Sequence, residues 1–586
     1  MQQLSREKES IMKKTVLTLA GSALLAGLAL PLAANAADED LQKRIDALSK
    51  EVELLKGQVK KVDDKSLGKW LTIGGDYRFK VDSLHGETKA YTSPSGLFSW
   101  LGQNALLSVD GTPYGFPPGS SVPVGTILTM ANSQMKSITK YNEAAVAAPQ
   151  FMGMLNTLAG QVGAQMPPNG AATNPGNTIN VPADKPKNTT LYTNKFGLDL
   201  HAKATQDVSV TVKLDMYKAF GSSDDNATTG TYFADRVGVF DGTVGHVPSD
   251  SKLNVDRAYA TWSNILEEPV WFSVGRRPST NGAPSNLRMN TARPGSSGAP
   301  ALLVDYAFDG GVLGIAPDID GLPGASAKLC YGRGFDAGID SSATTNSLKD
   351  TDMLGVAVIP IDTDPLRVWL QWNRGMNIFD FPVMYNTAFG DTAPAVNLGD
   401  IDWYGTGFMS TLKNVGPGSL NFFADFGLSI THPNNNVSAN AGYQGLGTGA
   451  FMAPEAPDDK TGWAAYLGVR YDLPSKTKLG FEYNHGSKNW ITFAPAADDM
   501  WTSKLGTRGN VFEPYIIQEL NLKPISSFTS KAFFKIGYQY YDFEYTGSNN
   551  WVGAPQKISD IQSSDLLLLT PLKSAQNIYA TFEVQF

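Results

Sequence analysis

The last nine residues of the chain, Ile578-Tyr579-Ala580-Thr581-Phe582-Glu583-Val584-Gln585-Phe586, alternate between two kinds of side chain. One parity is apolar and ends on the aromatic ring of Phe586, whereas the other carries groups with a polar end, such as Tyr579 and Glu583. A period of two residues predicts a β-strand with one apolar and one polar face. This strand alone is compatible with an ordinary amphipathic sheet and with a membrane barrel, so the rest of the chain decides the fold.

The same alternation recurs from Trp70 onward. In 208–220, for example, apolar residues occupy the even positions up to Met216, and polar or charged residues occupy most of the odd ones. We predict about sixteen strands, within a range of roughly fourteen to eighteen. They lie near 71–80, 191–204, 208–220, 253–263, 269–277, 302–316, 325–335, 352–361, 365–375, 401–413, 419–431, 461–473, 478–488, 510–522, 531–545 and 578–586.

Short and long connections alternate along this series of strands. The long ones are 82–190, 222–252, 278–301, 336–351, 376–400, 432–460, 489–509 and 546–573. An even strand number with short turns at one end and long loops at the other is typical of outer-membrane barrels. A soluble β-sandwich would bury its apolar faces between two sheets and does not predict this alternation. The sequence therefore predicts an all-β protein, a transmembrane antiparallel β-barrel over 70–586, with tryptophans such as Trp372, Trp403 and Trp490 at the membrane interfaces.

Residues 1–36 are predicted to be a secretory signal peptide. Lys13 and Lys14 precede an apolar run, and Ala34-Asn35-Ala36 is a small-x-small cleavage site. The alternative is an uncleaved anchor, against which the acidic residues that follow the site argue. Removal would take away four basic and two acidic residues and move the net charge from −8 to −10, which disfavours nucleic acid as a partner. The single cysteine, Cys330, excludes an internal disulfide framework.

Residues 37–66 are predicted to form a short coiled-coil helix. Apolar residues recur there at alternating spacings of four and three, which keeps one seam facing a partner helix. The core positions are Leu41, Ile45, Leu48, Val52, Leu55, Val59 and Val62. Their identities nominally favour two strands, whereas a trimeric barrel would impose three. The alternative is a single amphipathic helix lying on the barrel or on the cell envelope.

Taken together, the export signal, the heptads, the barrel pattern and the aromatic terminus resemble Gram-negative outer-membrane porins, in particular those that bear a coiled coil. The resemblance rests on organisation and not on a sharp motif. It implies an insertion signal formed by Phe582, Val584 and Phe586 and read by the outer-membrane assembly machinery. It also implies a homo-trimer in contact with outer-membrane lipid and lipopolysaccharide, with the coiled coil in the periplasm.

A sixteen-stranded barrel is too wide to be filled by its own strand side chains, so the sequence predicts a water-filled lumen. The pore wall is predicted from the polar parity of the strands and comprises Arg78, Asp199, Lys213, Asp215, Arg367, Asp425, Arg470, Glu482 and Lys535. Mixed charge of this kind indicates a hydrated wall and does not select an ion.

The third long loop, 278–301, is rich in arginine. In general porins the third external loop folds into the lumen and narrows it, and the resemblance therefore implies a constriction here. The basic side of this constriction is predicted to favour anions. An acidic side is predicted to face it across the pore. The residues are Arg276, Arg277, Arg288 and Arg293 on the basic side and Asp305 and Asp309 on the acidic side. The alternative is that the arginines bind carboxylates at the rim or lipopolysaccharide outside.

The first long loop, 82–190, departs from the general porin pattern. Residues 133–166 within it are predicted to be helical in two pieces broken near Pro149. Such a loop would cap the mouth of the barrel, contact a neighbouring subunit, or rest on the rim as a passive lid.

Catalysis finds no support, because the five histidines are scattered and lie in no metal-ligand or nucleophile motif. We therefore expect no enzymatic activity and no cofactor. The acidic pairs Asp224-Asp225, Asp458-Asp459 and Asp498-Asp499 either bind Ca²⁺ or divalent ions that bridge lipopolysaccharide, or are solvated loop charge. The leading hypothesis is a porin for passive diffusion of small hydrophilic solutes, with anions as the candidate class. The alternatives are a substrate-specific receptor or a barrel that houses a partner protein, and an envelope tether.

Overall fold

The computed structural model describes residues 70–94, 96, 106–109, 120–123, 135–162, 180–220, 248, 251–278, 282–291, 302–304, 307–339, 348–382, 384–387, 390–494, 499–523 and 530–586. The segments 1–36 and 37–66, with the predicted signal peptide and coiled coil, lie outside these residues. Leu71–Phe586 form one compact unit, and it is this unit that is described below.

Sixteen strands pair side by side into a closed barrel, each antiparallel to its neighbours. They are β1 (Leu71–Thr88), β6 (Lys187–Lys203), β7 (Val208–Ala219), β8 (Asn254–Trp262), β9 (Val270–Pro278), β10 (Ala307–Ile315), β11 (Ser326–Phe335), β12 (Thr351–Asp362), β13 (Arg367–Phe379), β16 (Asn397–Val415), β17 (Gly418–Pro433), β18 (Lys460–Asp472), β19 (Thr477–Gly486), β20 (Gly509–Glu519), β21 (Lys531–Phe543) and β22 (Leu572–Gln585). The predicted all-β, antiparallel sixteen-stranded barrel is confirmed, and every predicted strand overlaps an observed one.

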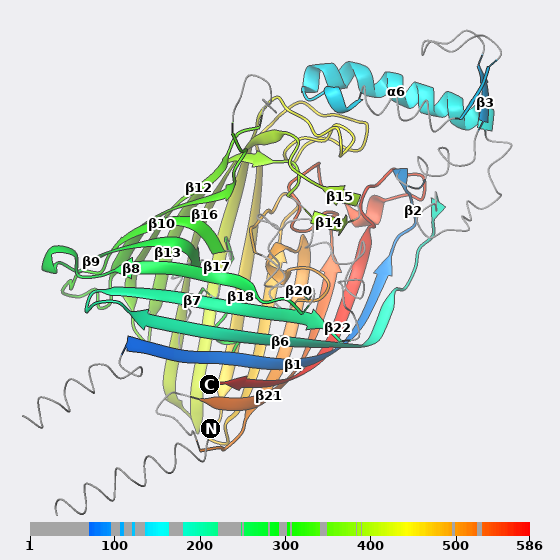
Figure 1. Cartoon of the computed structure of the whole chain (residues 1–586). Helices are drawn as coiled ribbons and strands as arrows, with labels where there is room; N and C mark the ends of the chain where they lie inside the picture. The colour runs from blue at the N-terminus through cyan, green and yellow to red at the C-terminus, as the bar shows by residue number, and fades with distance from the viewer. Residues whose placement is uncertain are drawn as a thin grey trace, which may run out of the picture. The chain divides into compact units, whose positions relative to one another are not determined.

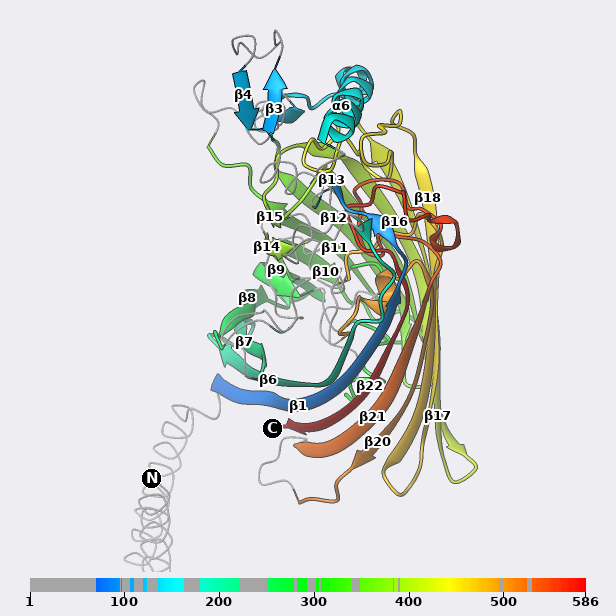
Figure 2. The same cartoon turned by 90° about the vertical axis from the view of Figure 1, so that its right-hand side faces the viewer.

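The last strand closes the barrel against the first. Phe582 of β22 lies opposite Phe79 of β1, and the register continues without a shift from Asp76↔Gln585 to Glu87↔Ser574. Phe586 extends this ladder, since its N–H donates to the carbonyl of Gly75 at 2.9 Å and its own carbonyl accepts from the Gly75 N–H at 2.8 Å. Figures 1 and 2 show β1 between β6 on one side and β22 on the other. The terminal alternation therefore joins the two ends of the sheet.

All connections at one end of the barrel are short, and those at the other end are longer. The strand bounds leave only 204–207 between β6 and β7, and only 416–417 between β16 and β17. At the opposite end we number eight loops. They are the first (89–186), second (220–253), third (279–306), fourth (336–350), fifth (380–396), sixth (434–459), seventh (487–508) and eighth (544–571).

The outer face of the barrel is apolar on every strand. Each of the sixteen strands carries at least one large apolar side chain that is more than a third exposed, and one from each strand is Ile73, Tyr192, Val210, Val255, Phe272, Leu313, Leu329, Val356, Leu370, Phe408, Phe426, Leu467, Phe481, Ile516, Phe534 and Ile578. An apolar surface that encircles a protein is far larger than the patches that soluble proteins expose to water. Such a belt is the lipid-facing surface of a transmembrane barrel.

In the described parts of the first loop there are four short strands and one long helix. These are β2 (Tyr91–Thr92), β3 (Leu106–Val109), β4 (Ser120–Pro123), β5 (Asn180–Val181) and α6 (Tyr141–Val162). The helix α6 continues through Pro149 as one element, contrary to the predicted two pieces. A proline inside a helix removes one backbone hydrogen bond and strains the preceding turn, but it can kink a helix without ending it. One face of α6 is buried at Ala144, Ala148 and Phe151. No helix among the described residues is long and apolar enough to cross a membrane.

The external loops fold back into the barrel and build a second, internal core. It includes Leu302 and Leu303 of the third loop, Phe381 of the fifth, and Trp490 and Phe493 of the seventh, all at most 1% exposed. The short strands β14 (Met384–Thr387) and β15 (Gly390–Thr392) and the 3-10 turns η5 (Lys504–Gly506) and η6 (Ile558–Asp560) also belong to these loops, whereas η4 (Ile265–Glu267) lies in a short connection.

Two tryptophans predicted at the membrane interface belong to this internal core. Trp403 donates its indole N–H to the carbonyl of Ile491 at 2.8 Å, and Trp490 donates to that of Leu505 at 2.7 Å. Both are fully buried, so their predicted interfacial position is wrong. The physical reason is that the infolded loops offer an apolar surface and free carbonyl acceptors inside the barrel.

Candidate functional site in the barrel lumen

All nine residues predicted to line the pore lie on the inner face of the barrel. Each has the parity opposite to the exposed apolar row of its strand, as Lys535 has to Phe534 and Glu482 to Phe481. Their surroundings differ, however. Arg78, Asp199, Lys213, Asp215 and Lys535 line an open cavity, and Asp425, Arg470 and Glu482 are buried. Arg367 pairs with Asp362 at 3.3 Å beside a short turn.

The third loop crosses the lumen and contacts the opposite wall. Arg470 of β18 donates to the carbonyl of Leu287 at 2.5 Å, and Lys535 of β21 lies 3.4 Å from the carbonyl of Arg288. Asn290 is bound on both sides, because its amide donates to Glu519 at 2.9 Å and its amide oxygen accepts from Lys478 at 2.6 Å. These strands belong to the far side of the barrel from β9 and β10, so the loop spans the interior.

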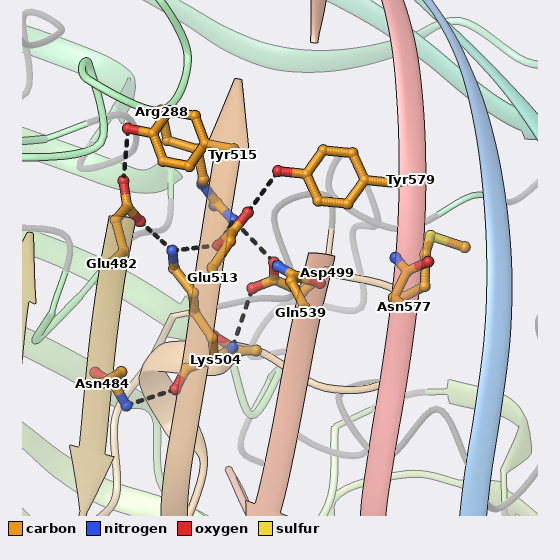
Figure 3. A network of polar contacts seen from close by, with 12 residues as sticks. Arg288, Glu482, Asn484, Asp499, Lys504, Glu513, Tyr515, Gln539, Asn577 and Tyr579 are labelled. Carbon is orange, nitrogen blue, oxygen red and sulfur yellow. Dashed lines mark hydrogen bonds and ion pairs between the residues drawn. The ribbon is translucent and has the colours of Figure 1, made fainter. Parts of the chain in front are cut away.

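A buried ionic network holds the third and seventh loops to this wall (Figure 3). Lys504 of the seventh loop lies between Glu482 and Glu513, pairing with the former and approaching the latter at 2.6 Å. Arg288 of the third loop pairs with Asp499 at 2.9 Å and lies 3.4 Å from Glu513. Burial alone would lower the pKa of Arg288, but the neighbouring carboxylates raise it well above its ordinary value. Both loops are thus fastened through charges that water does not screen.

Neutral donors complete the coordination of these carboxylates. Tyr579 of the final strand donates to Glu513 at 2.7 Å, and Gln539 donates to Asp499 at 2.6 Å. Tyr466 and Tyr515 contribute hydroxyls to Glu482 at 2.5 and 3.3 Å. A buried ionic cluster is tolerated when all its oxygens are bonded in this way.

An open cavity remains on the other side of the third loop. Its volume is about 390 Å³, and its walls come from β1, β6, β7, β8, β21 and β22 together with residues of the third loop. Five basic and five acidic side chains line it: Arg78, Lys195, Lys213, Arg257 and Lys535, and Asp76, Asp199, Asp215, Asp256 and Glu583. Lys213 is central, at 2.7 Å from Asp76, 3.7 Å from Asp199 and 3.8 Å from Asp215. The cavity is strongly polar and balanced in charge.

Four of the six residues of the predicted constriction are described, namely Arg276, Arg277, Arg288 and Asp309, and these four do not gather at one place. Arg276 and Asp309 pair at 3.2 Å, and both have the parity of the exposed Phe272 and Leu313. They therefore lie on the outer side of the wall, because the register of β9 and β10 continues through this pair without a shift.

Two of the remaining four face inward, in different settings. Arg277 packs its guanidinium over the ring of Tyr259 at 4.1 Å and lies 5.9 Å from that of Trp271. Arg288 is enclosed in the network described above. Arg293 and Asp305 lie outside the described residues.

Sequence reasoning did not find the partners that hold the loops, namely Lys504, Glu513 and Asp499. The strand that carries Glu513 has a weak pattern, with Pro514 within it, and the pair Asp498-Asp499 reads as loop charge. Only the fold reveals that the loop turns inward and carries Asp499 to a buried arginine.

The closed sixteen-stranded barrel, its apolar outer belt and its polar interior define a porin-like outer-membrane β-barrel. Residues 185–586, more than two thirds of the chain, match the model of a family described as "Protein of unknown function (DUF3373)". The chain belongs to this family. No curated protein matches it.

Solved barrels are similar to the chain at low identity. OprB of Pseudomonas putida is 10% identical with a TM-score of 0.37, covering 89% of this chain and 95% of its own. An anion-selective porin from Comamonas acidovorans is 10% identical with a TM-score of 0.36, covering 88% and 99%. The outer-membrane protein OmpT of Vibrio cholerae, in a trimer form, is 14% identical with a TM-score of 0.33, covering 69% and 93%. Similarity at this level carries no information on solutes.

Proposed function

We propose that the protein is a non-enzymatic outer-membrane channel through which small hydrophilic solutes diffuse passively. The observation that carries the proposal is the charged cavity of about 390 Å³ between the third loop and the wall formed by β1, β6, β7, β8, β21 and β22. A cavity lined by ten charged side chains favours water and hydrophilic solutes over apolar ones. A homo-trimer in the outer membrane, with lipopolysaccharide around it, is part of the same proposal.

A preference for anions is the finer part of the proposal. The ten charged side chains of the cavity are balanced in number, so by themselves they favour neither sign. Two other inward cations, Arg277 and Lys328, have no carboxylate partner among the described residues. Their positive charge makes the interior of the barrel more favourable to anions. Arg276, one residue away, faces outward and is neutralised by Asp309.

Planar-bilayer recording of the refolded full chain tests both parts. We expect stepwise conductance, and in a salt gradient a reversal potential that indicates anion preference. Arg277→Gln should move that potential toward zero, whereas the matched control Arg276→Gln should leave it in place. Folded protein that inserts but never conducts would contradict the channel. An equal effect of both substitutions would contradict the assignment of the preference to Arg277. Crosslinking of the same preparation tests the trimer.

A second candidate, a substrate-specific barrel with a movable interior, is favoured by the infolded loops. The internal core and the network around Lys504 occupy one side of the lumen. A channel for one solute would open by releasing this packing when the solute binds, and its conductance would then depend on that solute. A conductance that is the same with every small electrolyte favours the passive channel.

A further inference from the structure

A second, smaller pocket lies on the inner wall of β9–β13 and shares no lining residue with the open cavity. Its volume is about 60 Å³, with polar walls at Arg277, Lys328, Gln371 and Asn373. Val304, Phe308 and Met353 are among the apolar residues that line the rest. A cavity of this volume has room for roughly four to six water molecules. One small ion would fill the same space.

Three of the four polar residues of this pocket are buried and incompletely bonded. Arg277, Gln371 and Asn373 are 9%, 8% and 7% exposed. Within the described residues, three of their buried atoms have no hydrogen-bond partner: Nε of Arg277, Oε1 of Gln371 and Nδ2 of Asn373. Buried polar atoms are almost always bonded, so three atoms with bonding capacity left around one pocket are suited to a polar ligand.

The charge of the pocket specifies the sign of that ligand. No ion pair joins Arg277 or Lys328 to a carboxylate of the described residues. Arg277 instead lies over the ring of Tyr259 at 4.1 Å and hydrogen-bonds that side chain, and the ring of Trp271 is 5.9 Å away. A buried cation without a counter-charge is costly, and an anion from solution removes that cost. A guanidinium fork, an ammonium and a carboxamide N–H are the donors that bind oxoanions.

We propose that this pocket binds a small oxoanion that carries a hydroxyl group, of which hydrogenphosphate is the simplest. Arg277, Lys328 and Asn373 donate to its anionic oxygens, and the Gln371 Oε1 accepts from its hydroxyl. Gly355 permits the arrangement, because a side chain there would overlap the amide oxygen of Asn373. The site does not depend on conduction, since it lies apart from the open cavity.

Calorimetric titration of the refolded full chain in detergent micelles with inorganic phosphate tests the proposal. We expect saturable binding at one site per chain. Arg277→Gln and Lys328→Gln should weaken it by about ten- to a hundred-fold, the usual loss for a hydrogen bond to a charged group. Arg277→Lys keeps the positive charge but loses the forked guanidinium. Its affinity for phosphate should lie between those of the native chain and Arg277→Gln. Arg276→Gln, on the outer face, is the matched control and should bind as the native chain does.

Sulfate distinguishes the role of Gln371, because it has no hydroxyl at neutral pH and should bind more weakly than phosphate. Equal affinity for the two anions would overturn that role. Folded native protein without saturable phosphate binding, or an equal loss in Arg276→Gln and Arg277→Gln, would overturn the site. A chain that binds phosphate but does not conduct would refute the channel and leave this site standing.

Discussion

Replacing Lys504 by methionine should destabilise the barrel and release its seventh loop. The Lys504 side chain is 2% exposed, and those of Glu482 and Glu513 are each 1% exposed. With Asp499 and Arg288, the network holds three carboxylates and two cations, a net charge of −1. Lys504→Met removes one cation and makes the net charge of this buried network −2. Removing one partner of a buried ion pair costs about 3–5 kcal/mol, which corresponds to a shift of about a hundred-fold or more in the unfolding equilibrium.

Unfolding of the refolded full chain in micelles by denaturant, followed through tryptophan fluorescence, measures this cost. The control is Lys413→Met, because the Lys413–Asp364 pair at 2.9 Å is exposed on both sides and should contribute at most about 1 kcal/mol. Lys504→Met combined with Glu482→Gln restores the net charge of −1 and should recover part of the stability. In bilayers, the single variant should give larger or noisier conductance steps. If Lys504→Met unfolds at the same denaturant concentration as the native chain, the network does not hold the loops.

Two further predictions concern the barrel wall. Deleting Phe586 removes both of its backbone hydrogen bonds to Gly75 and should slow folding into liposomes, measured as the rate at which the heat-modifiable form appears in gel electrophoresis. Phe586→Leu keeps these bonds and should fold faster than the deletion; equal rates would refute the role of the bonds. Gly275→Ala should destabilise the barrel by about 1–3 kcal/mol, because Gly275 has φ +124° and an added Cβ would overlap the carbonyl oxygen of Ala258. Denaturant midpoints check this against Gly311→Ala, whose added Cβ would lie 3.6 Å from its nearest neighbour, and equal midpoints would contradict it.

The barrel itself could be predicted because lipid imposes a rule on every strand. Half of the residues of each strand must be apolar whatever the neighbouring strand contains, so the pattern of β17, for example, is visible without knowledge of its partners. The same parity placed the nine wall residues on the inner face. The predicted strand bounds fell short mainly at the loop end, where β1 continues to Thr88 and β13 to Phe379. The added end of β1 is largely polar, and in β13 the register shifts between Gly375 and Phe379, so neither extension keeps the alternation.

The interior could not be predicted, because it depends on contacts between segments far apart in the chain. Arg288 and Asp499 are separated by 211 positions, and nothing near either indicates the other. Arg276 and Arg277 look alike as a pair in the sequence. Only the register of β9 against β10 sends the first to Asp309 on the outside and leaves the second inside. The resemblance to porins indicated that the third loop turns inward, but not which residues it meets.

The internal core has a consequence for permeation. In an empty barrel the number of strands sets the width of the passage. Here the side of the lumen formed by β16–β21 is occupied by Trp403, Trp490 and Phe493 and by the ionic network. In the proposed channel, the molecular-weight cutoff would therefore depend on how the loops pack and not on the circumference of the barrel. Substitutions in the loops would widen or narrow this passage and leave the lipid-facing surface unchanged.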